Sequence, residues 1–244
     1  MNRILKAELY RIVHEKWLMI ASVSMIIFSI GFIAMQKTAM GYTVGIDRVL
    51  FLPMVMYGIV ISVLVSVFTC EEFDEGFIKN KIIALNNRRN IYLMGLISNI
   101  IASLAVYLIT AFFTLVVSYF LFNFNIGVID YIAYWIFGIF IMLSFVGIFY
   151  LISIVCAKKS KAITVNMGLA FIMLIASLIM NGMLRYDTNF FIGLLFDINP
   201  YGQLAQLTAM NAVNLFRCMT IDIIVFVILM ICGIRYFNKK DIMD

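Results

Sequence analysis

The sequence predicts an all-α membrane protein with six transmembrane helices, and three observations carry this prediction. Hydrophobic residues fill 64% of the 244 positions and charged residues only 13%, whereas an average soluble domain is about 45–50% apolar and about 25% charged. Six apolar runs are close to or above the roughly 20 residues that a helix needs to cross a bilayer. Basic residues gather in alternate connections between these runs. The composition excludes an ordinary soluble enzyme, a disordered chain and a secreted disulfide scaffold.

The six predicted spans follow one another with short connections. They cover residues 17–35, 49–70, 93–122, 131–156, 162–184 and 216–234. Fourteen of the 18 Lys and Arg residues lie in the N-terminal arm, the second-to-third and fourth-to-fifth connections, and the C-terminal tail. Short loops rich in positive charge stay on the cytoplasmic side, so both termini are expected in the cytoplasm. The net charge of +5 then reflects topology, and no nucleic-acid partner is expected.

The N-terminal arm, residues 1–16, precedes a single transmembrane domain that spans residues 17–244. Its apolar residues Leu5, Leu9, Ile12 and Val13 recur at helical spacing, with polar residues on the other side. This pattern predicts an amphipathic helix in the cytoplasmic interface, with Trp17 at the membrane boundary. A simple charged flank of the first span is the alternative.

The connection at residues 71–92 is the most unusual stretch outside the spans. Acidic residues come directly after the second span, and glycine, aromatic and basic residues follow: Glu71, Glu72, Asp74, Glu75, Gly76, Phe77, Lys79, Arg88 and Arg89. Its apolar residues are too many for a free loop, which predicts a short helix between the membrane and a docked partner protein. The alternative is a solvated cytoplasmic loop, in which the basic residues reflect only the preference of positive charge for the cytoplasmic side.

The outer connection, residues 185–215, is too interrupted by polar residues to form another span. It predicts short re-entrant or interfacial helices, because backbone at that depth must stay hydrogen-bonded. Asn199, Pro200 and Tyr201 mark a turn between two such pieces. An outer loop without a role is the alternative.

Few polar side chains lie within the predicted spans. Asp222 is the one candidate for an ion-linked role, and the alternative is pairing with a polar group on a neighbouring helix. Asn99, Asn166 and Asn181 are expected to be buried amides that bond across helices. The chain has no phosphate-binding loop, and its one histidine, His14, is outside the spans. No catalytic residue, metal site or cofactor is therefore expected on this chain.

Taken in order, these features resemble those of the type-2 ABC-transporter permeases, the six-span membrane subunits of small bacterial exporters. The likeness extends over the whole chain. It includes the segment from Glu71 to Lys79 after the second span, and the outer turn at Asn199, Pro200 and Tyr201. It also includes Arg88, Arg89 and Tyr92 before a long third span, and the tail Phe237-Asn238-Lys239-Lys240-Asp241-Ile242. The chain departs from the family pattern at Phe77, where threonine is common, and at Met94-Gly95, where a lysine often opens the third span.

The resemblance implies a coupling helix at residues 71–92 that seats in a separate ABC ATPase subunit, which would hold the ATP and Mg²⁺. It also implies a second permease chain, identical or different, in the bacterial plasma membrane. The expected substrate is an amphiphilic peptide, a lipid or a hydrophobic drug, as in antimicrobial-peptide or bacteriocin immunity and in peptide export. Two other functions stay open: an ion-coupled secondary transporter or channel using Asp222, and a membrane scaffold or sensor that docks a cytoplasmic protein.

Overall fold

The computed structural model describes residues 10–12, 14–39, 45–85, 87–122, 127–185, 190–210 and 214–240, and these residues form helices joined by turns. Six helical segments in the described ranges are long and apolar enough to cross a membrane, which makes this a multi-pass membrane protein. The long helices are α2 (Lys16–Ala39), α3 (Tyr57–Asp74), α5 (Arg88–Leu121), α6 (Val128–Cys156), α7 (Lys159–Leu184) and α10 (Leu215–Lys239). The second span starts earlier than α3, in the 3-10 helix η2 (Leu52–Met56).

The six predicted spans are confirmed in number and order, with longer bounds. The third span begins earlier than predicted, because α5 begins at Arg88 and continues for 34 residues. Its first turn is capped by Asn87, whose side chain accepts a hydrogen bond from the backbone N–H of Asn90, as a helix N-cap requires. Residues 1–9 and 13 of the predicted interfacial helix lie outside the described part, as do Asp241 and Ile242 of the tail.

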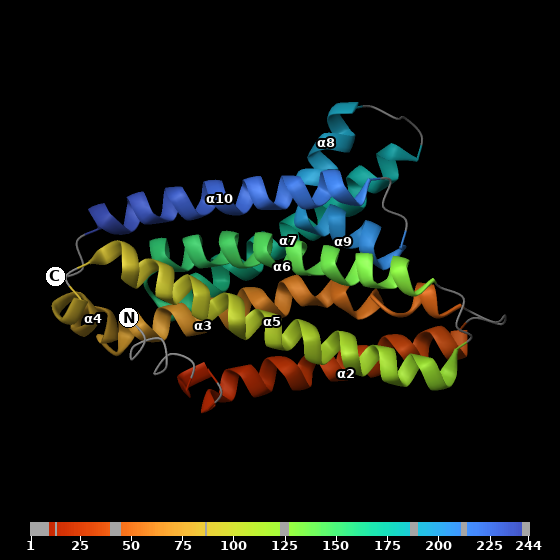
Figure 1. Cartoon of the computed structure of the whole chain (residues 1–244), viewed down its shortest axis with the longest axis horizontal. Coiled ribbons are helices and arrows are strands. Elements are labelled where there is room, and N and C mark those ends of the chain that lie inside the picture. Colours follow the sequence, from red (N-terminus) through yellow and green to blue (C-terminus); the bar gives the residue numbers. More distant parts are fainter. Residues whose placement is uncertain are drawn as a thin grey trace.

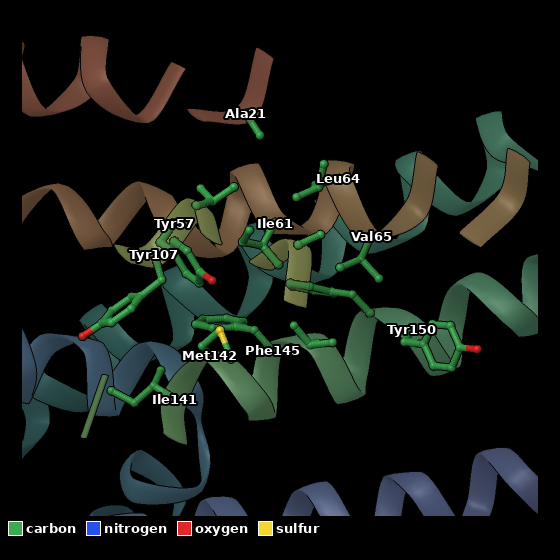
Figure 2. Packing of buried hydrophobic residues seen from close by; sticks show 14 of the residues in the cluster. Ala21, Tyr57, Ile61, Leu64, Val65, Tyr107, Ile141, Met142, Phe145 and Tyr150 are labelled. Carbon is green, nitrogen blue, oxygen red and sulfur yellow. The ribbon is translucent and has the colours of Figure 1, made fainter. Parts of the chain in front are cut away.

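The long helices run side by side along the long axis of the molecule (Figure 1). The central pair, α3 and α6, contains the most buried spans, whereas α2, α7 and α10 lie at the periphery and expose large apolar side chains. In the packing, α10 lies on α6, α7 on α3, and α2 on α5. Figure 2 shows Ile61 and Val65 of α3 and Phe145 of α6 between the two central helices. All three side chains are fully buried, so the core of the bundle is apolar and closely packed.

Tyrosines placed over glycines bring neighbouring helices close together. A Cβ atom at Gly138 of α6 would collide with the hydroxyl of Tyr107, which donates to the backbone oxygen of Trp135 at 3.0 Å. A Cβ atom at Gly233 of α10 would collide with the hydroxyl of Tyr92. Small residues allow such close approach between membrane helices, and here they hold α5 against both α6 and α10.

The two ends of the bundle differ in structure. One end, here called the basic end, carries the short helix α4 (Phe77–Leu85), the starts of α2, α5 and α7, and the end of α10 (Figure 1). The opposite end carries the short helices α8 (Phe190–Ile198) and α9 (Pro200–Thr208), with α8 projecting from the side of the bundle (Figure 1). The sequence predicts that the basic end faces the cytoplasm.

Candidate functional site

Glu71, one of the four acidic residues at the end of α3, faces the interior of the basic end. Its Oε1 accepts hydrogen bonds from Lys159 Nζ at 2.6 Å and from Trp17 Nε1 at 3.0 Å. The Lys159 ammonium also lies 4.8 Å from the centre of the Trp17 ring, within the range of a cation–π contact. Glu71 therefore joins the starts of α2 and α7 to the end of α3.

Glu72 forms a second junction beside the first. Its side chain is buried, and its Oε1 accepts from Arg11 Nη2 at 2.6 Å while its Oε2 pairs with Lys81 Nζ of α4 at 2.9 Å. A buried carboxylate needs such partners, because an unpaired charge is costly away from water. Glu71 and Glu72 thus connect segments of this chain, whereas Asp74 and Glu75 are exposed.

Gly76 makes the turn that separates α3 from α4. Its φ is +71°, a backbone conformation that glycine adopts without the penalty other residues have. The backbone N–H of Gly76 donates to the oxygen of Phe73, and its own oxygen accepts from the N–H of Asn80. The chain can therefore end one helix and start the next within two residues.

The short helix predicted between the second and third spans is present as α4, and it has two different faces. Ile78 and Ile82, one turn apart, are buried against the bundle. Phe77 and Ile83 are 44% and 73% exposed, although both are large and apolar. We define the α4 outer face by the exposed side chains of this region, which are Asp74, Glu75, Phe77, Lys79, Asn80 and Ile83.

The two arginines before the third span have different surroundings. Arg88 donates to the backbone oxygens of Asn238 at 3.2 Å and Lys240 at 2.7 Å, so it holds the end of α10. Arg89 is exposed. Lys240 donates in turn to the backbone oxygen of Ile154, and desolvation by burial lowers the pKa of its ammonium. The end of α10 is therefore fastened to both α5 and α6.

The three predicted intramembrane amides behave differently. Asn166 of α7 is fully buried. Its Nδ2 lies 2.7 Å from Ser66 Oγ of α3, 2.9 Å from Ser153 Oγ of α6 and 3.1 Å from the backbone oxygen of Phe149 of α6. Asn166 therefore bonds across helices, as predicted. Asn99 donates mainly within its own helix, to the oxygen of Gly95 at 2.8 Å, and only at 3.4 Å to Thr69 on α3. Asn181 is only half-buried and has no side-chain hydrogen bond to another described residue.

Asp222 is 2% exposed and bonds to a neighbouring helix, because Ser144 Oγ of α6 donates to its Oδ1 at 2.6 Å. Arg217, five residues before it on α10, pairs instead with Asp197 of α8. No local pattern in the sequence predicts Ser144 or Asp197 as these partners. Arg217 and Asp197 lie 20 positions apart, and no helical periodicity connects residues across that distance.

Asn199 separates α8 from α9, at the position where the sequence predicts a turn. The Asn199 side chain caps α9 by accepting from the N–H of Tyr201 at 3.1 Å, and its Nδ2 donates to the oxygen of Met173 on α7 at 2.8 Å. Tyr201 is buried, with its ring edge-on to Phe145 of α6 at a centroid distance of 5.1 Å. These contacts anchor α9 within the bundle.

The described site residues therefore form three groups: a cluster at the basic end that includes the α4 outer face, a set of polar groups within the spans, and the turn at Asn199, Pro200 and Tyr201 at the opposite end. The cluster at the basic end joins α2, α3, α4 and α7 and leaves one amphipathic surface exposed. No protein-family model matches the chain, and no curated protein matches its sequence.

Proposed function

We propose that this chain is the membrane-spanning permease subunit of an ATP-driven ABC exporter, and that α4 is the coupling helix. The observation that carries the proposal is the α4 outer face. A nine-residue helix directly after the second span exposes Phe77 and Ile83 beside Glu75 and Lys79. Exposed apolar side chains rimmed by charges are typical of protein contact surfaces, and the segment carries the sequence resemblance described above.

The attachment of α4 suits the transmission of force. Ile78 and Ile82 hold α4 against the bundle, and Lys81 binds it to Glu72 of α3. Glu71 extends the same connection to Lys159 at the start of α7. A protein that displaces α4 would therefore act on two spans at once. We infer that a separate ATPase subunit, with ATP and Mg²⁺, provides that displacement from the cytoplasm.

The bundle also suggests where a substrate would pass. Its core is filled by aromatic and aliphatic side chains, such as Phe145 and Phe149, whereas α2, α7 and α10 expose apolar surfaces. We infer that the substrate moves at an interface with a second permease chain, identical or different, in the bacterial plasma membrane. An apolar path with few charges suits amphiphilic peptides, lipids or hydrophobic drugs, as in antimicrobial-peptide immunity or peptide export.

The test is purification of the tagged chain from its host in mild detergent, with identification and quantification of bound proteins. We expect a stoichiometric subunit that carries a phosphate-binding loop and hydrolyses ATP. Ile83→Asp should lose this subunit, because a carboxylate replaces an apolar contact at the α4 outer face. Tyr10→Asp is the matched control, because Tyr10 is also exposed and apolar at the basic end. Absence of an ATPase from the wild-type complex, or equal loss with both variants, would contradict the proposal.

A second candidate function, ion-coupled transport, is favoured by the burial of Asp222 among spanning helices. Reconstitution of the chain alone into liposomes separates the two. Flux that a proton gradient drives without any ATPase, and that Asp222→Asn abolishes, would support the secondary transporter. Flux that requires the ATPase and ATP would support the exporter. A protein that binds the α4 outer face without any flux would indicate a scaffold or sensor.

A further inference from the structure

Three lysines at the start of α7 have different surroundings. Lys159 faces the bundle, where its ammonium group pairs with the carboxylate of Glu71 at 2.6 Å. Lys158 and Lys161 are exposed, and neither forms an ion pair with another residue that the structure describes. The junction at the basic end therefore uses one of the three lysines, and two positive charges stay at the surface.

The stability of α7 does not explain these two charges. The start of a helix carries partial positive charge, so cations there are unfavourable. The first turn of α7 contains no acidic residue, and its N-cap, Lys158, provides no side-chain hydrogen bond. By contrast, Lys239 lies in the last turn of α10, where a cation is favourable. Lys158 and Lys161 thus concentrate positive charge without stabilising their helix, which favours an anion beside them.

The two exposed lysines continue an apolar stripe on the same side of α7. Lys158 precedes Val165 by seven residues and Lys161 precedes it by four, so the three share one face of the helix. Farther along this face, Ile172 and Ile175 are 65% and 54% exposed. From Val165 to Ile175 the helix rises about 15 Å, which is half of the roughly 30 Å of hydrocarbon in a bilayer. The stripe therefore matches the depth of one leaflet.

A fourth lysine lies at the same corner of the basic end. The ammonium groups of Lys16, at the start of α2, and of Lys159 lie 5.7 Å and 4.8 Å from the centre of the Trp17 ring. Among the described residues, Glu71 alone forms an ion pair with one of these four lysines. Tryptophan prefers the level of the lipid headgroups, so the lysines around Trp17 are expected at the level of the phosphates.

We propose that this corner binds the phosphate group of an anionic phospholipid, whose acyl chains lie along the apolar stripe of α7. Lys158 and Lys161 are the charged contacts, and Lys16 adds attraction from the side. Val165 and Ile172 contact the acyl chains. A second copy of the chain suits this face less well. In a symmetric dimer the same lysines of both copies would lie at one depth and repel each other where α7 meets α7.

The lipid headgroup would adjoin the junction between α3 and α7. Lys159 lies between the two exposed lysines in the sequence and binds Glu71 at the end of α3. A phosphate at this corner offsets the repulsion among the lysines, so an anionic bilayer should hold the start of α7 more firmly in place. Lipid binding here needs no ATPase, and its tests therefore use the full chain alone.

The first test is titration of the purified chain with phosphatidylglycerol or with phosphatidylcholine of the same acyl chains, followed by native mass spectrometry. We expect phosphatidylglycerol to bind more tightly, and Lys158→Gln with Lys161→Gln to lower its affinity about 30-fold. Arg235→Gln with Lys239→Gln is the matched control, because it removes the same charge from exposed positions at the same end of the bundle and should keep most of the affinity. Equal binding of the two lipids, equal loss in the two double variants, or displacement of the lipid by inorganic phosphate would overturn the proposal.

The second test locates the acyl chains and does not depend on the lysine variants. A fluorophore is attached to Ile172→Cys in an otherwise cysteine-free chain in nanodiscs. Brominated phosphatidylglycerol, as a minor component, should quench it more than the same fraction of brominated phosphatidylcholine. Ile228→Cys, at an exposed position of α10, is the control and should show no such preference. If Ile172→Cys instead forms a disulfide-linked dimer and its fluorophore shows no preference between the lipids, a second copy covers this face and the lipid assignment is wrong.

Discussion

Arg11 Nη2 donates to Glu72 Oε1 at 2.6 Å, across 61 positions of sequence. The same carboxylate pairs with Lys81 of α4, so the segment before α2, the end of α3 and the amphipathic helix meet at one buried group. Beside it, Glu71 binds Lys159 and Trp17. The four acidic residues at the end of the second span therefore differ in their contacts. Glu71 and Glu72 join segments of the basic end, whereas Asp74 and Glu75 are exposed.

Neutralisation of these acidic residues should have unequal effects on stability. Glu72→Gln removes the negative charge that faces Arg11 and Lys81 in a poorly hydrated site, and should lower the free energy of unfolding by about 1–3 kcal/mol. Glu75→Gln alters an exposed residue and should change it by less than about 0.5 kcal/mol. Thermal unfolding of both variants in the same detergent measures the difference. Equal effects would mean that Glu72 is not a junction.

Asn166 and Asn181 lie on the same helix, α7, and differ in burial, so the effects of replacing each of them can be compared. Asn166→Ala removes the group that bonds Ser66, Ser153 and the Phe149 oxygen, and we expect a loss of about 1–2 kcal/mol, the range for hydrogen bonds between membrane helices. Asn181→Ala, on the same helix but half-buried, should have little effect. A thermal shift in nanodiscs tests both variants, and a larger loss from Asn181→Ala would refute the assignment of Asn166 as the link between α3, α6 and α7.

The turn at Gly76 should tolerate no side chain without strain. Its positive φ costs an L-residue roughly 1–2 kcal/mol, although the space around it is open. Gly76→Ala should therefore lower the Tm. Gly168→Ala is the control, because Gly168 lies inside α7 with open space and should leave the Tm unchanged or slightly raised. If Gly76→Ala also reduces ATP-dependent flux more than its Tm explains, the orientation of α4 matters for coupling.

The orientation of the bundle can be tested with introduced cysteines. We expect Asn214→Cys, in an otherwise cysteine-free chain, to react with a membrane-impermeant maleimide on intact cells. Lys239→Cys should react only after the cells are opened, because positively charged loops stay in the cytoplasm. Both positions are exposed, at opposite ends of α10. Labelling of Lys239→Cys on intact cells would reverse the predicted topology.

Sequence reasoning predicted the spans because a membrane helix is specified locally, by a run of apolar residues of sufficient length. It also predicted the helix now seen as α4 and the turn between α8 and α9, since the many apolar residues between the second and third spans and the pair Asn199-Pro200 are local signals. It did not separate Asn166 from Asn181, because both are asparagines on one apolar helix. Their different burial depends on which face of α7 meets α3.

The amino-acid sequence by itself determined the six apolar segments that can span a membrane, the connections in which the basic residues gather, and the short helical segments between the spans. Hydropathy and turn chemistry act over a few residues, so these properties can be read along the chain. The tertiary structure decided the partners: Glu72 with Arg11 and Lys81, and Arg217 with Asp197. Such contacts depend on how the helices pack and rotate against one another, which no local pattern specifies.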